Sequence, residues 1–315
     1  MPLPTALEGR LRLPVVAAPM FLASGPDLVV GACRAGVLGT FPALNQRTAE
    51  GFEQWLDQIE AALTPQDAPY GVNLIVHSSN RRLREDLATI VRHQVPVVIT
   101  SLGAAAEVVE AVHSYGGLVF HDVTNARFAA KAAAAGVDGI IAVSAGAGGH
   151  AGDRNPFALV AEIRSVWDGP LLLSGCLSTG ADVLGALAMG ADLAYLGTRF
   201  LATAEAIAPA EHKAMVVASG AGDVVYTPSI SSVPANFLRR SISDAGLDPD
   251  NLPLPDRVDL DHLTDPSAAK AWKDVFSAGQ GVQAIHDVPP VAELVDRLER
   301  EYQDALDRLP VPAQL

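Results

Sequence analysis

Residues 171–200 read LLLSGCLSTGADVLGALAMGADLAYLGTRF, and this stretch decides the fold. A short apolar run is followed by a turn of Gly, Ser and Thr, by an Ala-rich helical segment and by a second apolar run. The joint Met189-Gly190-Ala191-Asp192 leads into that second run, because glycine ends a helix in a left-handed turn and the apolar residue after it starts a strand. The stretch therefore predicts two parallel strands connected by a helix.

The same unit recurs along the first 200 residues. Similar joints, Ala-Gly-Val and Ala-Gly-Val-Asp, stand before Leu38 and Gly139. Because the runs are apolar on both faces, they indicate a sheet covered on both sides, and eight of them favour a closed (β/α)8 TIM barrel over an open sheet. The predicted strands are 13–17, 37–40, 70–75, 97–100, 118–121, 139–143, 171–174 and 193–196. The predicted helices are 26–34, 50–63, 81–93, 104–114, 126–135, 157–166 and 181–189.

The strand pattern ends near residue 203. Pro, Asp, Asn and Ser are dense between 228 and 266, so we expect residues 206–284 to form a helical C-terminal excursion or lid that lines the substrate site. Its expected helices lie near 209–218 and 267–276. The barrel domain would then comprise residues 1–205 and 285–315, and the apolar stripe Val291, Leu294, Val295 and Leu298 predicts a last helix over 290–309 that packs back on the barrel.

Composition excludes several classes of protein. Of 315 residues, 49% are hydrophobic and 18% charged, which is incompatible with a disordered chain. The aromatic share is only 5%, so the core must consist of small and branched aliphatic side chains. A net charge of 22 − 36 = −14 disfavours nucleic acid and anionic membrane surfaces as partners. An anionic ligand must therefore be held locally, by backbone N–H groups.

Other patterns point to a cytoplasmic protein without a metal. The first residues lack the basic start and apolar stretch of a secretory signal, and apolar runs end well before the ~18 residues of a membrane span. Cys33 and Cys176 lie far apart in the sequence and are expected to be reduced thiols. The histidines have no partners at metal-ligand spacing, so we expect no metal site. The sequence leaves a homo-oligomer open.

The barrel fold directs attention to the residues that follow each strand, where such enzymes have their active sites. These residues are mainly Gly, Ser, Asn and His. They are Pro19, Met20, Asn73, Ser101, His121, Asp122, Ser144, Ser174, Gly175, Gly197 and Thr198.

The loops after the seventh and eighth strands are the usual phosphate site of this fold. Gly175 and Gly197 allow the backbone to approach a phosphate, Thr198 adds a hydroxyl, and a short helix beginning at Arg199 would present N–H groups. The alternative is that these glycines only make tight turns between strand and helix.

The loop Ser144-Ala145-Gly146-Ala147-Gly148-Gly149-His150-Ala151-Gly152 is the most unusual segment. Its backbone could lie against a flat ligand, while one imidazole is presented to that ligand. An imidazole can accept a proton or stabilise an anion near neutral pH, so His150 is the candidate catalytic residue. His121 and Asp122 are neighbours on a strand and must point to opposite faces. We interpret His121 as either a cofactor contact or a core residue.

These motifs together resemble the nitronate monooxygenases, formerly called 2-nitropropane dioxygenases. The match runs in order from about residue 14 to 205, and the Gly-Gly-His element followed by Gly-Thr-Arg-Phe is its most specific part. The matching segments are Pro19-Met20, Gly71-Val72-Asn73-Leu74, Ala147 to Gly152, Ser174-Gly175 and Gly197-Thr198-Arg199-Phe200. Residues 277–281 also resemble a late segment that covers the flavin in this family.

The resemblance implies an FMN-dependent TIM barrel that oxidises alkyl nitronates with O₂ to a carbonyl compound and nitrite. His150 matches the catalytic histidine of the family. Taking the strand-end positions and the resemblance together, we expect a wider set of residues to contact FMN. That set is Pro19, Met20, Asn73, His121, Ser144, Gly148, Gly149, Ser174, Gly175, Gly197, Thr198, Gln280 and Gly281.

Two positions depart from the family pattern. Val143 stands where members often have Gln or Asp, and Asp122 stands where some relatives have Lys after the fifth-strand histidine. The hydroxyls of Ser101 and Ser144 could substitute for the missing cation. The substrate is expected to be a nitronate or a related anion.

Three other functions are compatible with the pattern. The first is an NAD(P)H-dependent FMN oxidoreductase that reduces a quinone or an enoyl thioester on the same scaffold. The second is a non-redox isomerase or aldolase that binds a sugar phosphate, although no lysine stands at a predicted strand end for a Schiff base. The third is a flavin-binding protein without turnover.

Overall fold

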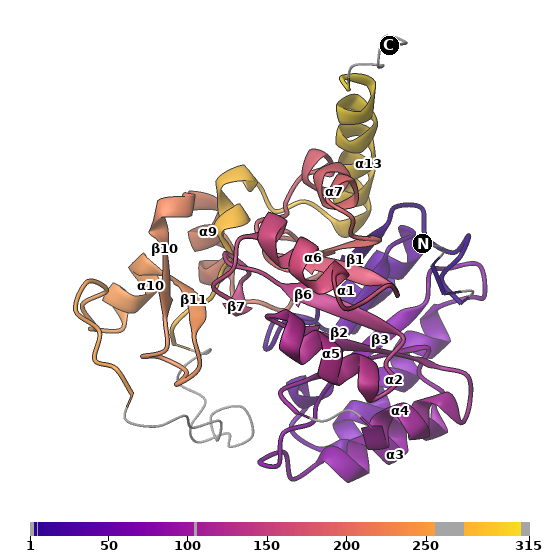
Figure 1. Cartoon of the computed structure of the whole chain (residues 1–315). Helices are drawn as coiled ribbons and strands as arrows, with labels where there is room; N and C mark the ends of the chain where they lie inside the picture. Colours follow the sequence, from indigo (N-terminus) through magenta and orange to yellow (C-terminus); the bar gives the residue numbers. More distant parts are fainter. Residues whose placement is uncertain (1–2, 5, 104–105, 256–273, 310–315) are drawn as a thin grey trace.

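Eight parallel strands close into a barrel (Figure 1). The computed structural model describes residues 3–4, 6–103, 106–255 and 274–309. The barrel order is β1-β2-β3-β4-β5-β6-β8-β9, and β9 closes it by pairing with β1. The strands are β1 (Val15–Ala17), β2 (Leu38–Pro42), β3 (Tyr70–Ile75), β4 (Val97–Ser101), β5 (Leu118–Val123), β6 (Gly139–Val143), β8 (Leu171–Ser174) and β9 (Leu193–Leu196). All eight predicted strands and the TIM barrel are confirmed.

Helices between the strands form the outer layer. Thr48, Asn125 and Thr179 begin three of them with side chains that accept a backbone N–H of the first turn. The helices are α1 (Pro26–Arg34), α2 (Ala49–Ala62), α3 (Leu83–Arg92), α4 (Ala106–His113), α5 (Ala126–Ala134), α6 (Pro156–Arg164), α7 (Gly180–Ala188) and α8 (Thr198–Leu201). Among the described residues, no helix is both long enough and apolar enough to cross a membrane.

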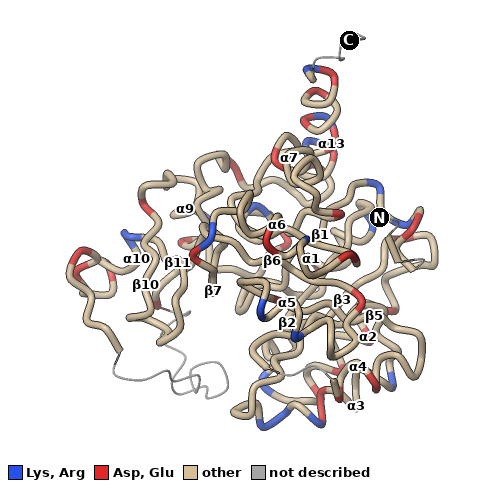
Figure 2. Tube along the Cα trace, viewed as in Figure 1, with Lys and Arg blue, Asp and Glu red and all other residues tan. Residues whose placement is uncertain are grey.

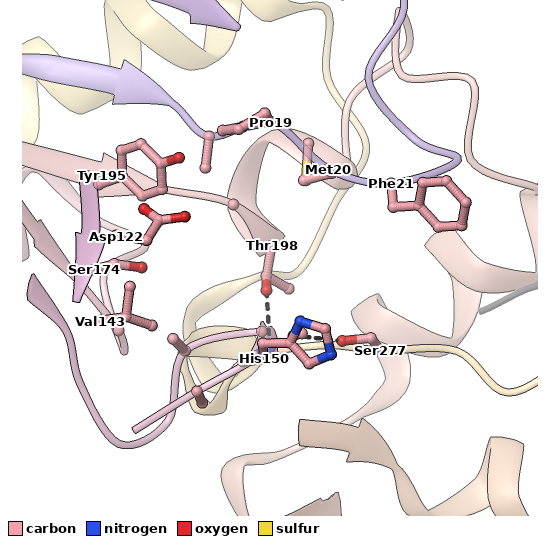
Figure 3. Close-up of a pocket in the computed structure, with 18 of the residues that line it drawn as sticks. Pro19, Met20, Phe21, Asp122, Val143, His150, Ser174, Tyr195, Thr198 and Ser277 are labelled. Atoms are coloured by element: carbon pink, nitrogen blue, oxygen red, sulfur yellow. Dashed lines mark hydrogen bonds between the residues drawn. The ribbon is translucent and has the colours of Figure 1, made fainter. Parts of the chain in front are cut away.

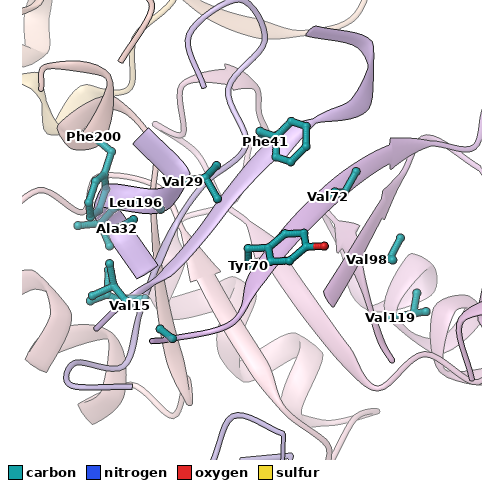
Figure 4. Packing of buried hydrophobic residues seen from close by; sticks show 14 of the residues in the cluster. Val15, Val29, Ala32, Phe41, Tyr70, Val72, Val98, Val119, Leu196 and Phe200 are labelled. Carbon is teal, nitrogen blue, oxygen red and sulfur yellow. The ribbon is translucent and has the colours of Figure 1, made fainter. Parts of the chain in front are cut away.

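The strands bury both of their faces. Val72, Val98 and Val119 on the strands and Val29 and Ala32 on α1 belong to one buried cluster between the strands and the helices (Figure 4). The inner face holds a separate cluster: Leu7, Val16, Ala18, Leu38, Val97, Ile99, Phe120, Ile141, Leu172, Leu193 and Tyr195. Glycine allows close packing between β5 and β6, because a Cβ on Gly139 would lie 2.6 Å from the Phe120 ring. The Lys, Arg, Asp and Glu residues instead lie mainly on the helices and loops (Figure 2).

The described residues of the C-terminal excursion, 206–255 and 274–284, lie beside the barrel (Figure 1) and are only partly helical. The excursion contains the predicted helix α9 (Ala210–Ala218), α10 (Arg239–Asp244) and the 3-10 turns η2 (Ala221–Asp223) and η3 (Gln280–Ala284). It also contains two strands, β10 (Val224–Thr227) and β11 (Ala235–Leu238), that the sequence did not predict. Their four-residue runs are too short to show an alternating pattern, and they are stabilised by pairing with each other and with β7 (Gly149–His150). The helix expected over 267–276 falls largely outside the described residues.

The last helix, α13 (Val291–Asp307), packs on α7 and α1. Its predicted apolar stripe is buried. The approach to α7 is very close, because a Cβ on Gly180 would lie 2.0 Å from the Leu298 carbonyl oxygen and 2.3 Å from the Tyr302 backbone nitrogen. The Glu301 carboxylate also accepts the Gly180 N–H at 2.8 Å. Helix α13 therefore depends on a glycine at the start of α7.

Candidate functional site

A cavity of about 850 Å³ opens at the carboxyl ends of the barrel strands. Its floor is the barrel interior, and its walls come from the strand-end loops and the excursion (Figure 3). Most of the predicted site residues line it. They are Pro19, Met20, Asn73, Gly148, Gly149, His150, Ser174, Gly175, Gly197, Thr198 and Gly281.

Three predicted cofactor contacts do not line the cavity. His121 points to the outer layer, where its Nδ1 shares a 2.7 Å hydrogen bond with Thr100 Oγ1, and burial lowers its pKa to about 4. Of the two interpretations of His121, the structure therefore favours a core residue over a cofactor contact. Ser144 is fully buried and donates to the Ser174 carbonyl at 2.7 Å. Gln280 is exposed and bonds through its backbone N–H to the Gly146 carbonyl at 2.9 Å. The Ser144 side chain and the Gln280 backbone thus stabilise the loops at Ser174 and Gly146 through hydrogen bonds, without lining the cavity.

The excursion positions His150. Residues Gly149 and His150 form β7, which pairs with Asn236 and Ala235 of β11. The Asn236 amide also donates to the Ala147 carbonyl at 2.7 Å. His150 lines the cavity from this small sheet, across from the barrel floor (Figure 3). Because the His150 backbone is paired in a strand, the position of its Cα and Cβ atoms is fixed. A glycine-rich loop without such pairing would leave that position variable.

A second segment, residues 277–281 (the strap), ties the glycine loop to the barrel. The Ser277 hydroxyl accepts the Gly149 N–H at 2.6 Å and donates to the Asn236 carbonyl at 2.7 Å. The Gly279 N–H donates to Thr198 Oγ1 at 2.9 Å. A Cβ on Gly279 would lie 2.6 Å from the Gly146 carbonyl oxygen. Ser277, Gly279 and Gly281 of the strap therefore form part of the cavity wall.

The strand-end loops 174–180 and 195–200, which the sequence predicts to bind a phosphate and which we call the phosphate loops, contain one notable polar group. Ser178 Oγ is buried and has no hydrogen-bond partner among the residues that the structure describes. It lines the cavity together with Gly175, Gly197 and Thr198. A buried hydroxyl without a partner is costly, so it indicates that a ligand atom or water bonds there.

The glycines in and around these loops serve different purposes. Gly175 has φ +122°, and a Cβ there would lie 2.2 Å from Ser144 Oγ, so protein packing alone requires glycine. A Cβ on Gly197 would meet nothing closer than 3.8 Å. Gly197 thus leaves space facing the cavity. Gly175, in contrast, is explained by the tight turn between strand and helix alone.

Other donors near the phosphate loops are already occupied. The N–H groups of Ser178 and Thr179 donate to the Asp182 carboxylate at 2.9 and 2.8 Å, as a capping box of α7. Arg199 does not line the cavity: its guanidinium lies 3.3 Å from Asp287 Oδ1 and donates to the Ala202 carbonyl. An anion would therefore be held by Ser178, Thr198 and backbone groups rather than by an arginine.

The cavity floor has an acidic group, Asp122, that is not among the residues expected to contact FMN. Asp122 points inward from β5, since its neighbours Phe120 and Val123 belong to the inner and outer clusters respectively. It lines the cavity on the same side as Tyr195 and Ser174 (Figure 3). Its Oδ1 has no hydrogen-bond partner within the described ranges, and burial raises the pKa of the carboxyl to about 7. Strand alternation would have identified Asp122 rather than His121 as the inward residue.

The outer part of the cavity is largely apolar. Side chains of Phe21, Phe128, Ile207, Tyr226 and Val233 contribute to it. Arg154 is the one lysine or arginine that lines the cavity within the described part of the chain, and its Nε already lies 2.9 Å from Glu162. The site therefore suits an organic molecule with a localised negative charge better than a polyanion.

Replacing Asp122 by Asn is expected to remove a pH-dependent loss of stability. The folded pKa, about 7, is above the ordinary value of 3.8, so the folded protein keeps a proton that the unfolded chain releases. The free energy of unfolding should therefore fall as pH rises from about 4 to 7 and level off above 7. Three pKa units correspond to about 4 kcal/mol, and water in the open cavity reduces this, so we expect about 2 kcal/mol.

Denaturant unfolding between pH 4.5 and 8 measures this difference. Asp122→Asn should match the wild type at the acidic end and exceed it in stability at pH 8. Asp153→Asn, at an exposed carboxylate lining the same cavity, is the matched control and should follow the wild type. Parallel pH profiles of wild type and Asp122→Asn would show that the carboxyl titrates normally.

Comparison with known proteins gives a consistent family assignment. The model of the nitronate monooxygenase family matches residues 6–301. A nitronate monooxygenase of Paraburkholderia phytofirmans is 26% identical, over 94% of this chain and 94% of that protein. A (3aS,4S,5R,7aS)-5-hydroxy-7a-methyl-1-oxo-octahydro-1H-indene-4-carboxyl-CoA dehydrogenase of Rhodococcus jostii is 29% identical over 76% of this chain, and the match spans 65% of the dehydrogenase.

Solved structures share the architecture over nearly the whole chain. A nitroalkane oxidase from Streptomyces ansochromogenes superimposes with a TM-score of 0.79 at 28% identity, covering 97% of this chain and 100% of that one. FabK from Thermotoga maritima has a TM-score of 0.79 at 22% identity, with 96% of each chain covered. The second likeness concerns the fold alone.

Proposed function

Because this chain belongs to the nitronate monooxygenase family and is an oxidoreductase, we propose that it oxidises alkyl nitronates with O₂ to a carbonyl compound and nitrite, using FMN. The observation that carries the proposal is the placement of His150 over a barrel-mouth cavity whose phosphate loops contain the buried, unpartnered Ser178 hydroxyl. Residues 206–284 would serve as the cover that completes this cavity.

The residues present fit FMN. The phosphate would be held by Ser178, Thr198 and the backbone at Gly197, where the cavity has a buried hydroxyl and space. Pro19, Met20, Asn73, Gly148 and Gly149 would contact the remainder of the cofactor. Asn73 is oriented for this by its amide, which donates to Ser101 Oγ at 3.3 Å. Bound FMN would supply the electron acceptor and the site of reaction with O₂.

The protein's own contribution is to bind, orient and handle protons. His150 is the proposed catalytic residue, which as a base would take the proton from the carbon of a neutral nitroalkane. As a cation it would stabilise a nitronate anion that enters already ionised. The apolar wall that includes Phe21, Ile207 and Tyr226 would bind the alkyl part and exclude bulk water, which strengthens the interaction between His150 and the anion.

Two measurements test the proposal. The purified full-length chain is expected to show a flavin absorption spectrum, or to gain one when FMN is added. Under anaerobic conditions the flavin should be bleached by a nitronate and should persist with NADH or NADPH. Rapid bleaching by a reduced nicotinamide would support the reductase alternative instead, and a colourless protein that does not take up FMN would overturn both.

A further inference from the structure

Asp122 is an acidic group on the cavity floor, and no cation among the described residues pairs with it. The barrel interior around it is built from apolar side chains, including Phe120, Ile99 and Ile141. No ion pair within the described residues includes Asp122, and its Oδ1 accepts no hydrogen bond there. The carboxyl is nevertheless not sealed in the core, because it lines the cavity and faces whatever is bound there (Figure 3).

An uncompensated carboxylate in such a position is unfavourable. Removing a charge from water without a cation or several donors costs far more than removing the neutral acid. Burial accordingly raises the pKa of Asp122 to about 7. The neutral acid has an O–H that can be donated, whereas the carboxylate can only accept.

Among the described residues of the cavity floor, no group other than Asp122 changes its protonation near neutral pH. Tyr195 of β9 faces Asp122, and the pKa of its phenol is raised well above 10 by burial and by the Asp122 charge, so it stays neutral. On the outer face of β5, the strand that carries Asp122, the pKa of His121 is lowered to about 4. The adjoining inward residues Val143 of β6, Ser174 of β8 and Ser101 of β4 do not titrate in this range. The other titratable residues lining the cavity are His150, Asp153, Arg154, Cys176, His212 and Tyr226, from the loops and the excursion.

We propose that Asp122 holds a proton in the occupied site and donates it, as a hydrogen bond, to an acceptor atom of the flavin ring. This inference rests on the proposed binding of FMN. The ring edge of a flavin presents carbonyl and imine acceptors, which a protonated carboxyl can satisfy. Cofactor binding above neutral pH then requires Asp122 to take up one proton from solvent.

Linkage gives the sign and size of the effect. When only the protonated form binds, affinity falls tenfold for each pH unit above the pKa of the free protein. With a pKa of about 7, the dissociation constant of FMN should rise about 50-fold between pH 7 and 9. An ionised Asp122 that accepted a ring N–H would give the opposite sign, because affinity would then rise with pH.

The experiment measures FMN binding rather than turnover. Full-length protein freed of cofactor is titrated into FMN at pH 6, 7, 8 and 9, and the quenching of flavin fluorescence gives the dissociation constant. Asp122→Asn keeps the shape of the acid and a donor group but cannot titrate, so its dissociation constant should change less than about threefold between pH 7 and 9. The second pKa of the phosphate, near 6, affects all variants equally below pH 7.

A control and a second readout complete the test. Asp153→Asn removes an exposed carboxylate that lines the same cavity and should keep the wild-type pH dependence. Calorimetry of wild-type protein at pH 8, in two buffers with different ionisation enthalpies, should report uptake of about one proton per FMN bound, and this readout needs no variant.

The outcomes separate the two proposals. A pH dependence shared by wild type and Asp122→Asn, or release of a proton on binding, would overturn this inference and leave the proposed function intact. Absence of FMN binding at every pH would overturn the proposed function and this inference with it.

Discussion

Replacing His150 by Asn is expected to lower kcat/KM for a neutral nitroalkane by about 10²–10⁴-fold, the usual contribution of a positioned general base. The Asn amide is similar in size to imidazole but cannot accept the carbon-bound proton at neutral pH. A preformed nitronate needs no base, so its turnover should fall less, by the loss of the stabilising cation alone. Steady-state O₂ consumption with each substrate measures the two effects.

The flavin content of the variant is the control for this experiment. His150 is carried by β7, whose backbone bonds to β11 and the strap do not use the imidazole, so FMN should remain bound. Unaltered turnover of both substrates by a variant with full flavin content would remove His150 from the mechanism. Equal losses for both substrates would assign it the electrostatic role only.

Replacing Gly180 by Ala is expected to destabilise the fold by about 3 kcal/mol, at the upper end of overpacking effects. The new Cβ would lie 2.0 Å from the Leu298 carbonyl oxygen, a backbone atom of α13 that cannot rotate away. The helix must therefore shift as a unit, which also strains the bond from Gly180 N–H to Glu301. Denaturant unfolding at neutral pH measures the change.

Gly185→Ala is the matched control for this substitution. Gly185 lies in the same helix, α7, and a Cβ there meets no atom within 4 Å. Alanine in a helix interior is more favourable than glycine by roughly 0.5–1 kcal/mol, so this variant should be slightly more stable than the wild type. Similar effects of the two substitutions would show that helix propensity, and not the contact with α13, dominates.

The barrel could be predicted from the sequence because its pattern is local. Each apolar run, turn and Ala-rich helix is specified within about 20 residues, and the Gly joints before Leu38, Gly139 and Leu193 mark where helices end. The closed order of strands then follows from the number of units. The strand-end rule also found the residues on the cavity wall, since that wall is a direct consequence of the fold.

What could not be predicted depends on contacts between distant segments. Strands β10 and β11 are short and form because they pair with each other and with β7, which lies about 85 residues earlier than β11. Ser144 belongs to the predicted loop, but its hydroxyl donates to the Ser174 carbonyl instead of facing the cavity. A loop sequence does not reveal the direction in which a side chain points. For β5 the information was present, because alternation along the strand places Asp122 inward and His121 outward.

The pairing of β7 with β11 has a consequence for the order in which a ribosome makes this protein. All eight barrel strands have been synthesised at residue 196, whereas Ala235 and Ser277, which hold the His150 segment, follow 39 and 81 residues later. At translation rates of about 5–20 residues per second, the growing chain spends roughly 4–16 seconds with every barrel strand made and the strap still missing. The nascent chain therefore holds all the strands of its scaffold before it holds a site able to act.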